Sequence, residues 1–152
     1  MSLDGRVAVV TGGASGMGEA TARLLAGSGA VVTVVDLDAD GAERVSDGCG
    51  GRAVVGDVSD PVFCSKAIDG VVDANGRIDV LVNAAGIVLR ADAAGTEDDQ
   101  WRRMMAVNVD GVFFMSRAAV RHMVDRRSGS IINFGSIWGD VGAVGVVAYC
   151  AG

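Results

Sequence analysis

A loop rich in glycine occupies residues 11–18, where the sequence reads Thr-Gly-Gly-Ala-Ser-Gly-Met-Gly between an apolar run and a helix-like segment. Glycines remove bulky side chains from a helix start, where free backbone N–H groups and the helix dipole favour negative charge. Gly12 would allow a tight turn, Gly16 the close approach of a pyrophosphate, and Gly18 the contact of helix with strand. The spacing is GxxxGxG rather than GxGxxG, but the strand-loop-helix context predicts a phosphate-binding loop rather than an ordinary flexible turn.

The second apolar run ends with a carboxylate, Asp36, which stands eighteen residues after Gly18. At that position it can accept hydrogen bonds from the ribose hydroxyls of an adenosine, and it would repel a 2′-phosphate. The next residue is Leu37 and the loop offers Ser15, so no cation is evident that would receive such a phosphate. We therefore predict NAD in preference to NADP, with Ser15, Met17, Asp36 and Leu37 among the cofactor-binding residues. An Asp after a strand can also be only a solvated cap.

Five short runs rich in Val and Ala could position this chemistry. They span residues 6–11, 30–36, 52–58, 79–85 and 130–136. Each is nearly continuous in apolar residues, which indicates strands buried on both faces of a parallel sheet. Parallel strands need crossover helices, so we predict an α/β fold, a Rossmann-like doubly wound sheet in three α/β/α layers with strand order 3-2-1-4-5. No linker or repeat divides the chain, so residues 1–152 are expected to form a single NAD-binding domain.

Helical segments alternate with these runs. The first is predicted to bury Met17, Ala20, Leu24 and Leu25 on one face. Asp60 followed by Pro61 predicts an N-cap with proline at the first helical position. That helix presents Phe63, Ala67 and Val71 at four-residue spacing.

A further helical stretch is predicted from Thr96, a capping hydroxyl followed by three acidic residues at the positive end of the helix. It should carry Trp101 and Met105 inward, end near Asn108, and continue as a second segment to about Arg126. That second segment has a common face made of Val112, Met115, Ala119 and Met123.

With these residues identified, the chain resembles the short-chain dehydrogenase/reductase family from Arg6 to its last residue. Its cofactor-binding motifs match in order. Gly12, Gly16 and Gly18 match the family's cofactor loop, Asp57 and Val58 its adenine-contacting pair, and Asn83, Ala84, Ala85 and Gly86 its NNAG segment. Ala84 replaces the second Asn of that segment.

The resemblance extends to three catalytic positions. Asn108 matches the family's catalytic Asn, Ser136 its serine, and Tyr149 the tyrosine of its YxxxK motif; Ser136 and Tyr149 are thirteen positions apart, as the family pattern requires. The resemblance implies interconversion of a secondary alcohol and a ketone by hydride transfer to or from NAD. Tyr149 would be the general acid or base, Ser136 would hold the carbonyl oxygen, and Asn108 would position water in a proton relay.

One expected group is absent from the sequence given. The family's lysine stands four residues after the tyrosine, whereas Gly152 is three residues after Tyr149 and ends the chain. Lys66, the only lysine, falls on a different predicted helix and cannot replace it. The resemblance thus implies a C-terminally incomplete domain, roughly three-fifths of a family member without its last strands, that binds NAD better than it turns substrate over. The alternatives are a catalytically incomplete fragment and a non-enzymatic dinucleotide-binding module.

Composition excludes several function classes. The formal net charge is −6, with twelve scattered Arg and one Lys, which argues against nucleic acid as a partner. Three cysteines without CxxC spacing predict reduced thiols and no metal site. Neither a signal peptide nor a membrane span is evident, so we expect a cytoplasmic protein. By resemblance it would be a homodimer or homotetramer that acts on a small-molecule alcohol or ketone.

The apolar stretch at residues 137–148 has two interpretations that the sequence leaves open. Its larger side chains are Trp138, Val141, Val144, Val146 and Val147. They could line an apolar substrate pocket or pack against other parts of the protein.

Overall fold

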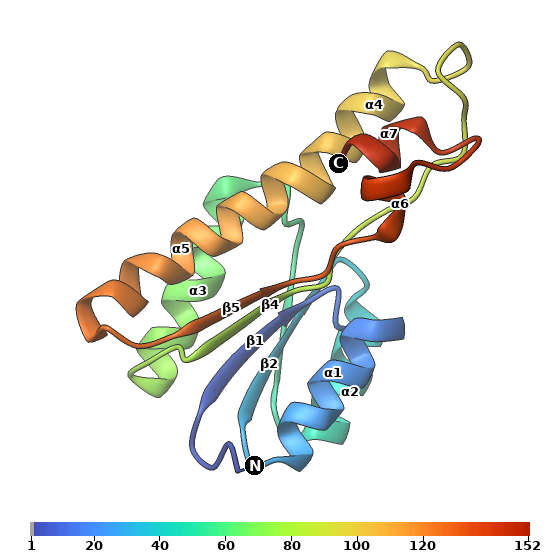
Figure 1. The fold of residues 1–152 in the computed structure, drawn as a ribbon. Coiled ribbons are helices and arrows are strands. Elements are labelled where there is room, and N and C mark those ends of the chain that lie inside the picture. Colours follow the sequence, from blue (N-terminus) through green and yellow to red (C-terminus); the bar gives the residue numbers. More distant parts are fainter. Residues whose placement is uncertain (1) are drawn as a thin grey trace.

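The computed structural model describes residues 2–152 as a sheet with helices on both faces (Figure 1). The strands are β1 (Val7–Thr11), β2 (Val31–Asp36), β3 (Arg52–Val55), β4 (Val80–Asn83) and β5 (Ser130–Asn133). The α-helices are α1 (Gly16–Gly27), α2 (Ala39–Cys49), α3 (Pro61–Asn75), α4 (Asp98–Met105), α5 (Gly111–Arg126), α6 (Ile137–Val141) and α7 (Val147–Ala151). A π-helical turn, Ala106–Asp110, joins α4 to α5.

All paired strands of this sheet are parallel, in the order β3-β2-β1-β4-β5. The predicted Rossmann-like fold and strand order are therefore confirmed. The order reverses between β1 and β4, and in open α/β sheets ligands bind beyond the carboxyl ends of the strands at such a switch point. The glycine loop follows β1, so the topology places it at this point.

The central strands are buried on both sides because successive residues face opposite faces of the sheet. Val7 and Val9 of β1 belong to a core shared with α3 and α5, and Ala8 and Val10 to a second core shared with α1 and α2. Figure 1 shows these two helix pairs on opposite sides of the sheet. The chain thus forms the three predicted layers.

The two outer strands differ from the prediction of burial on both faces. In β3, Val55 is 46% exposed, and in β5, Ile132 is 47% exposed, because these strands lie at the edges of the described sheet. Three strands also end before the predicted boundaries at residues 58, 85 and 136. The residues beyond them leave the ladder and form the loops described below as the functional site.

The predicted apolar face of α1 is largely wrong. Met17 and Leu24 are 65% and 71% exposed, and Ala20 is exposed as well. The helix instead packs through the small residues Gly18 and Ala22, with Leu25 beside them. Small side chains let the helix axis approach the sheet closely, which the four-residue spacing of larger apolar residues did not reveal.

The start of α4 also differs from the prediction. Glu97 is the N-cap and forms a capping box with Gln100, whereas the Thr96 hydroxyl donates to the Asp92 carbonyl at 2.6 Å. Trp101 is 41% exposed and Met104 is the buried residue, so α4 buries a different face from the predicted one.

Other helix predictions are confirmed. The Asp60 side chain caps α3 by accepting from the Val62 N–H, with Pro61 in the first turn. Ala67 and Val71 are buried in the core, with Phe63 packed against it. On α5, Met115, Ala119 and Met123 are buried together, and Val112 is half-buried. The three cysteines are free thiols.

Two glycines allow the turn after β1 to nest against the end of β4. A Cβ atom on Gly12 would lie 2.6 Å from the Ala85 Cα, and a Cβ on Gly18 would lie 2.0 Å from the Gly12 carbonyl oxygen. Real Cβ atoms do not approach backbone so closely, so neither position accepts a side chain without movement of the loop. On Gly16, by contrast, a Cβ would point into open space.

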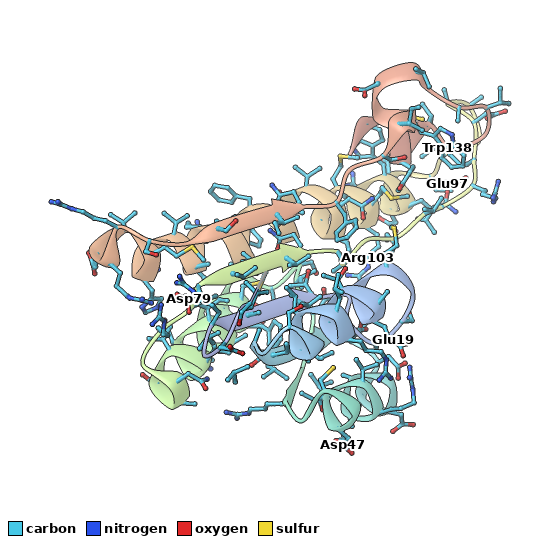
Figure 2. All side chains as sticks on the ribbon, turned by 60° about the horizontal axis from the view of Figure 1, so that its bottom comes forward. Glu19, Asp47, Asp79, Glu97, Arg103 and Trp138 are labelled. Carbon is cyan, nitrogen blue, oxygen red and sulfur yellow. The ribbon has the colours of Figure 1, made fainter. Side chains whose placement is uncertain are left out.

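A buried carboxylate stabilises the end of the sheet opposite the glycine loop, where β1 and β4 begin. Asp79, just before β4, is 3% exposed and accepts the Val7 N–H at 3.0 Å. Arg6, Arg77 and Arg126 form ion pairs with the same carboxylate. Burial raises the pKa of Asp79, but the Arg77 and Val7 hydrogen bonds outweigh it and lower the pKa to about 2. Figure 2 shows Asp79 well away from Glu19 and Arg103, which lie toward the other end of the sheet.

We expect Gly18→Ala to lower the free energy of unfolding by about 1–3 kcal/mol, because the added methyl group overpacks the loop. Urea denaturation followed by circular dichroism measures this change. Gly27→Ala is the matched control, since a Cβ at the far end of α1 meets nothing within 4 Å. Equal stability of the two variants would contradict the packing argument.

Asp79→Asn should lower the free energy of unfolding by about 1–3 kcal/mol near neutral pH, because it removes the charge that the arginines and the Val7 N–H stabilise. The folded-state pKa of Asp79 is depressed to about 2, so its stabilising contribution is present above the unfolded pKa of about 4 and lost as the pH falls below it. The difference between wild type and variant should therefore shrink as urea melts are repeated at more acidic pH. Asp47→Asn, on the exposed surface of α2, should show no difference at any pH.

Candidate functional site

Two adjoining clefts lie at the carboxyl ends of the strands. The first, of about 330 Å³, is bounded by the glycine loop and the ends of β2, β3 and β4. The second, of about 300 Å³, lies beside it toward β5, α6 and α7. Met17, Ala84, Ala85 and Gly86 line both clefts. An extended ligand can therefore pass from one cleft to the other across these four residues.

The first cleft gathers almost all of the residues predicted to bind the cofactor. Those that line it are Gly12, Ser15, Gly16, Met17, Gly18, Asp36, Leu37, Asp57, Val58, Ala84, Ala85 and Gly86. The exception is Asn83, which is 2% exposed and lines neither cleft. Its Nδ2 donates to Asn133 Oδ1 at 2.8 Å and to Ser116 Oγ at 3.1 Å. Asn83 thus ties β4 to β5 and α5, a structural position that its motif alone did not distinguish from a ligand contact.

The glycine loop is held from both sides by charged groups. Asp36 Oδ2 accepts the Ala14 N–H at 2.9 Å, and Arg44 Nη2 donates to the Ala14 carbonyl at 2.8 Å. Arg44 also pairs with Glu19 of α1 at 2.9 Å. Hydrogen bonds from Arg44 and Arg23 lower the pKa of Glu19 to about 2. No sequence pattern pointed to Arg44, because its partners are thirty and twenty-five residues away.

The start of α1 presents unused donors to the first cleft. Ser15 is the N-cap, and its side chain makes no capping hydrogen bond. The first backbone N–H groups of a helix have no acceptor within the helix. Because Gly16 adds no side chain here, an anionic group can reach these N–H groups and the Ser15 hydroxyl directly.

The Asp36 carboxylate keeps part of its capacity free. Its Oδ2 accepts the Ala14 N–H, and its Oδ1 accepts the Asp38 N–H at 3.0 Å. A carboxylate offers about four acceptor sites, and Asp36 lines the first cleft. The strand tip therefore points toward the glycine loop, as the sequence hypothesis requires, and can accept further hydrogen bonds from a ligand.

Asp57 lies at another wall of the first cleft, after β3. Its Oδ1 accepts from the Ser59 N–H at 2.9 Å and the Ser59 hydroxyl at 2.7 Å, while Arg103 Nη1 donates to its Oδ2 at 3.0 Å. Burial raises the pKa of Asp57, but these hydrogen bonds outweigh it and hold the pKa below its usual value. Arg103 itself lines the cleft, and no sequence motif pointed to it.

Thr11 joins the glycine loop to the segment after β4. Its hydroxyl oxygen accepts the N–H groups of Ala84 and Ala85, both at 3.2 Å. These two residues line both clefts. A buried hydroxyl at the end of β1 therefore fixes the backbone at the junction between the clefts.

The predicted catalytic residues all line the second cleft. Asn108 lies in the π-helical turn, a feature that often marks functional sites. Its Oδ1 accepts the Ile87 N–H at 2.9 Å, and its Nδ2 donates to the Ile87 carbonyl at 3.0 Å. Its side-chain amide is thus paired with the backbone that follows Gly86.

Ser136 and Tyr149 reach the second cleft from different elements. Ser136 Oγ accepts the Trp138 N–H at 3.2 Å as the N-cap of α6, which leaves its hydroxyl hydrogen free to donate. Tyr149, on α7, is half-buried and packs edge-on against Trp138, with ring centroids 6.0 Å apart. The tertiary structure therefore brings both hydroxyl groups to the wall of one cleft.

The apolar stretch at residues 137–148 does not line the second cleft with its large side chains. Val141 is 72% exposed and Val144 fully exposed, whereas Val146 is buried. Of the two interpretations of this stretch, the structure gives no support to an apolar pocket within the described residues. Lys66, on α3, lines neither cleft.

Among residues 2–152, no three His, Cys, Asp or Glu side chains gather closely enough to hold a metal ion. The same part of the chain has no helix with the length and apolar character needed to span a bilayer.

Comparison with known proteins gives a consistent result. The family model described as short chain dehydrogenase matches residues 6–152. The chain is 40% identical over 154 residues to D-threitol dehydrogenase of Mycolicibacterium smegmatis, covering 98% of this chain and 59% of that protein. It is 39% identical over 154 residues to meso-2,3-butanediol dehydrogenase of Serratia marcescens, covering 99% and 61% respectively. Among solved structures, the crystal structure of gox2181 superposes with a TM-score of 0.95 at 34% identity, covering 99% of this chain and 62% of that one.

The chain spans 59% and 61% of the length of the two relatives named above. The residues that the family model matches include the glycine loop, Asp36 and the three predicted catalytic residues, which line the second cleft. Fold, motifs and sequence identity agree, and the chain belongs to the short-chain dehydrogenase family.

Proposed function

We propose that the protein is an NAD-dependent oxidoreductase that interconverts a secondary alcohol and a ketone. The observation that carries this proposal is the continuity of the two clefts. The first has an anion-binding helix start and a ribose-binding carboxylate, and the second has two hydroxyl side chains suited to proton transfer. Met17 and the Ala84–Gly86 backbone line both, so one dinucleotide can occupy the first cleft and extend its nicotinamide into the second.

The residues present fit such a dinucleotide. Gly16 leaves open space where a diphosphate would meet the start of α1, and Asp36 keeps acceptor sites for two ribose hydroxyls. Arg103 is the only cation that lines the first cleft among the described residues, and it is paired with Asp57. A 2′-phosphate beside Asp36 would therefore meet a negative charge without a neighbouring free cation, which favours NAD over NADP.

The chemistry of the second cleft concerns the proton on the substrate oxygen. When bound, NAD supplies the hydride acceptor at its nicotinamide C4. Tyr149 takes the hydroxyl proton during alcohol oxidation and returns it during ketone reduction. Ser136 donates a hydrogen bond to the same oxygen, and this bond strengthens as negative charge develops there. Asn108 holds the Ile87 backbone, so it can bind water only through the groups that this pairing leaves free.

Tyr149 can act as a base only where a positive charge stabilises its phenolate. Neither cleft contains a lysine among the described residues. The family motif places a lysine four residues after the tyrosine, and such a cation would stabilise the phenolate. Turnover therefore requires a protein that carries this cation, whereas NAD binding depends on residues already present here.

Two relatives, which are named for D-threitol and meso-2,3-butanediol, support a proposal for the substrate class. Both compounds have four carbons and carry hydroxyl groups on two neighbouring secondary carbons. We propose four-carbon polyols with this vicinal pair, including 2,3-diols, as the first substrates to assay with the whole protein.

Wild-type protein should bind NAD clearly more tightly than NADP by isothermal titration calorimetry. Asp36→Asn removes the charge while keeping an amide oxygen as acceptor, so NAD affinity should fall about tenfold and the preference over NADP should narrow. Asp38→Asn is the matched control, because Asp38 caps α2 and does not line the first cleft. Equal affinities of wild type for NAD and NADP would remove the role assigned to Asp36.

Tyr149→Phe should reduce alcohol oxidation by about 10²–10⁴-fold, the usual contribution of a positioned acid or base. The assay follows NADH absorbance with a diol substrate, using the whole protein. Affinity for NAD should stay within about twofold of wild type, since the glycine loop and Asp36, which are proposed to bind the diphosphate and the ribose, line the first cleft and Tyr149 does not. Retained turnover in this variant would exclude the tyrosine mechanism.

A further inference from the structure

Arg103 connects two elements that are far apart in sequence. It belongs to α4, yet its Nη1 donates to Asp57 Oδ2 at 3.0 Å and to Ser59 Oγ at 3.3 Å, forty-six and forty-four residues away. Arg103 also lines the first cleft together with Asp57 and Val58. Figure 2 labels it where α4 approaches the ends of the strands. The contact therefore joins α4 to the segment after β3 at the wall of the first cleft.

The neighbouring Arg102 shows that this contact is specific to one arginine. Arg102 pairs with Asp98 at 3.1 Å and with Asp99 at 3.2 Å, both on its own helix. Its side chain is 68% exposed, and it does not line the cleft. The two arginines have the same charge and adjacent positions, so they form a natural pair for comparison.

The contacts of Arg103 fix the Asp57 carboxylate. Ser59 supplies two donors to Oδ1, and Arg103 supplies one to Oδ2. A carboxylate with three donors on two sides cannot rotate freely, and one acceptor site of Oδ2 remains for a ligand in the cleft. A negatively charged oxygen held in this way accepts from an amino group and repels a carbonyl oxygen.

We infer that Arg103 is a positioning residue for the base of the dinucleotide, holding Asp57 so that the cleft selects a 6-amino purine over a 6-oxo purine. This inference rests on the proposed binding of NAD. Adenine presents an exocyclic amino group that can donate to Asp57. Hypoxanthine presents a carbonyl oxygen at the same place, which the carboxylate repels.

The test compares two dinucleotides that differ only in this group. NAD and nicotinamide hypoxanthine dinucleotide are titrated by calorimetry into the wild-type protein and into Arg103→Gln, Arg103→Lys and Arg102→Gln variants. Wild type should prefer NAD by about tenfold. Arg103→Gln should lose most of this preference through weaker NAD binding, with affinity for the hypoxanthine analogue changed less than twofold. Arg103→Lys should restore part of it, and Arg102→Gln should match wild type.

The possible failures are distinguishable. If Arg103→Gln lowers the affinity for both dinucleotides equally, Arg103 supports the fold or the cleft without a role in selecting the base, and the inference is overturned. If Arg103→Gln keeps the wild-type preference, the inference is overturned while the proposed function stands. If folded wild type binds neither dinucleotide, the proposed function fails, and the inference fails with it.

Discussion

The close packing of backbone against backbone at the switch point is the constraint on which the rest of the structure depends. Gly12 lies against the backbone at Ala85, and Gly18 lies against Gly12. Without side chains at these two positions, the start of α1 reaches the end of β4, and Thr11 can bond the Ala84 and Ala85 N–H groups. The two clefts adjoin at this point, where Met17, Ala84, Ala85 and Gly86 line both.

Near this junction, charged side chains hold the protein by hydrogen bonds and keep further acceptor sites for a ligand. Asp36 uses its two oxygens to hold the backbone of Ala14 and Asp38, and Asp57 is held by Ser59 and Arg103. Each carboxylate retains acceptor sites that face the first cleft. Preorganised in this way, they do not have to be ordered when a ligand binds, and less of the binding free energy is lost to entropy.

Stability and chemistry are placed at opposite ends of the sheet. The buried Asp79 and its arginines hold the amino ends of β1 and β4, whereas the clefts lie at the carboxyl ends. Parallel strands make this separation possible, because all of their carboxyl ends meet at one edge. Loops at that edge can vary to suit a substrate while the opposite edge keeps the sheet together.

The sequence by itself determined the parallel sheet, the glycine loop and the position of Asp36, because these follow from local apolar patterning and from spacing along one stretch of chain. The strand order was predicted from the Rossmann-like class that this alternation indicates. Tertiary structure decided which side chains meet across long separations. In the tertiary structure, Asn83 hydrogen-bonds to Asn133 of β5 and does not line a cleft. Met17 and Trp101 are exposed. Arg44 contacts the glycine loop, and Arg103 contacts Asp57. A one-dimensional pattern does not specify such pairs, since neighbouring arginines such as Arg102 and Arg103 look alike until the packing of α4 turns only one of them toward the cleft.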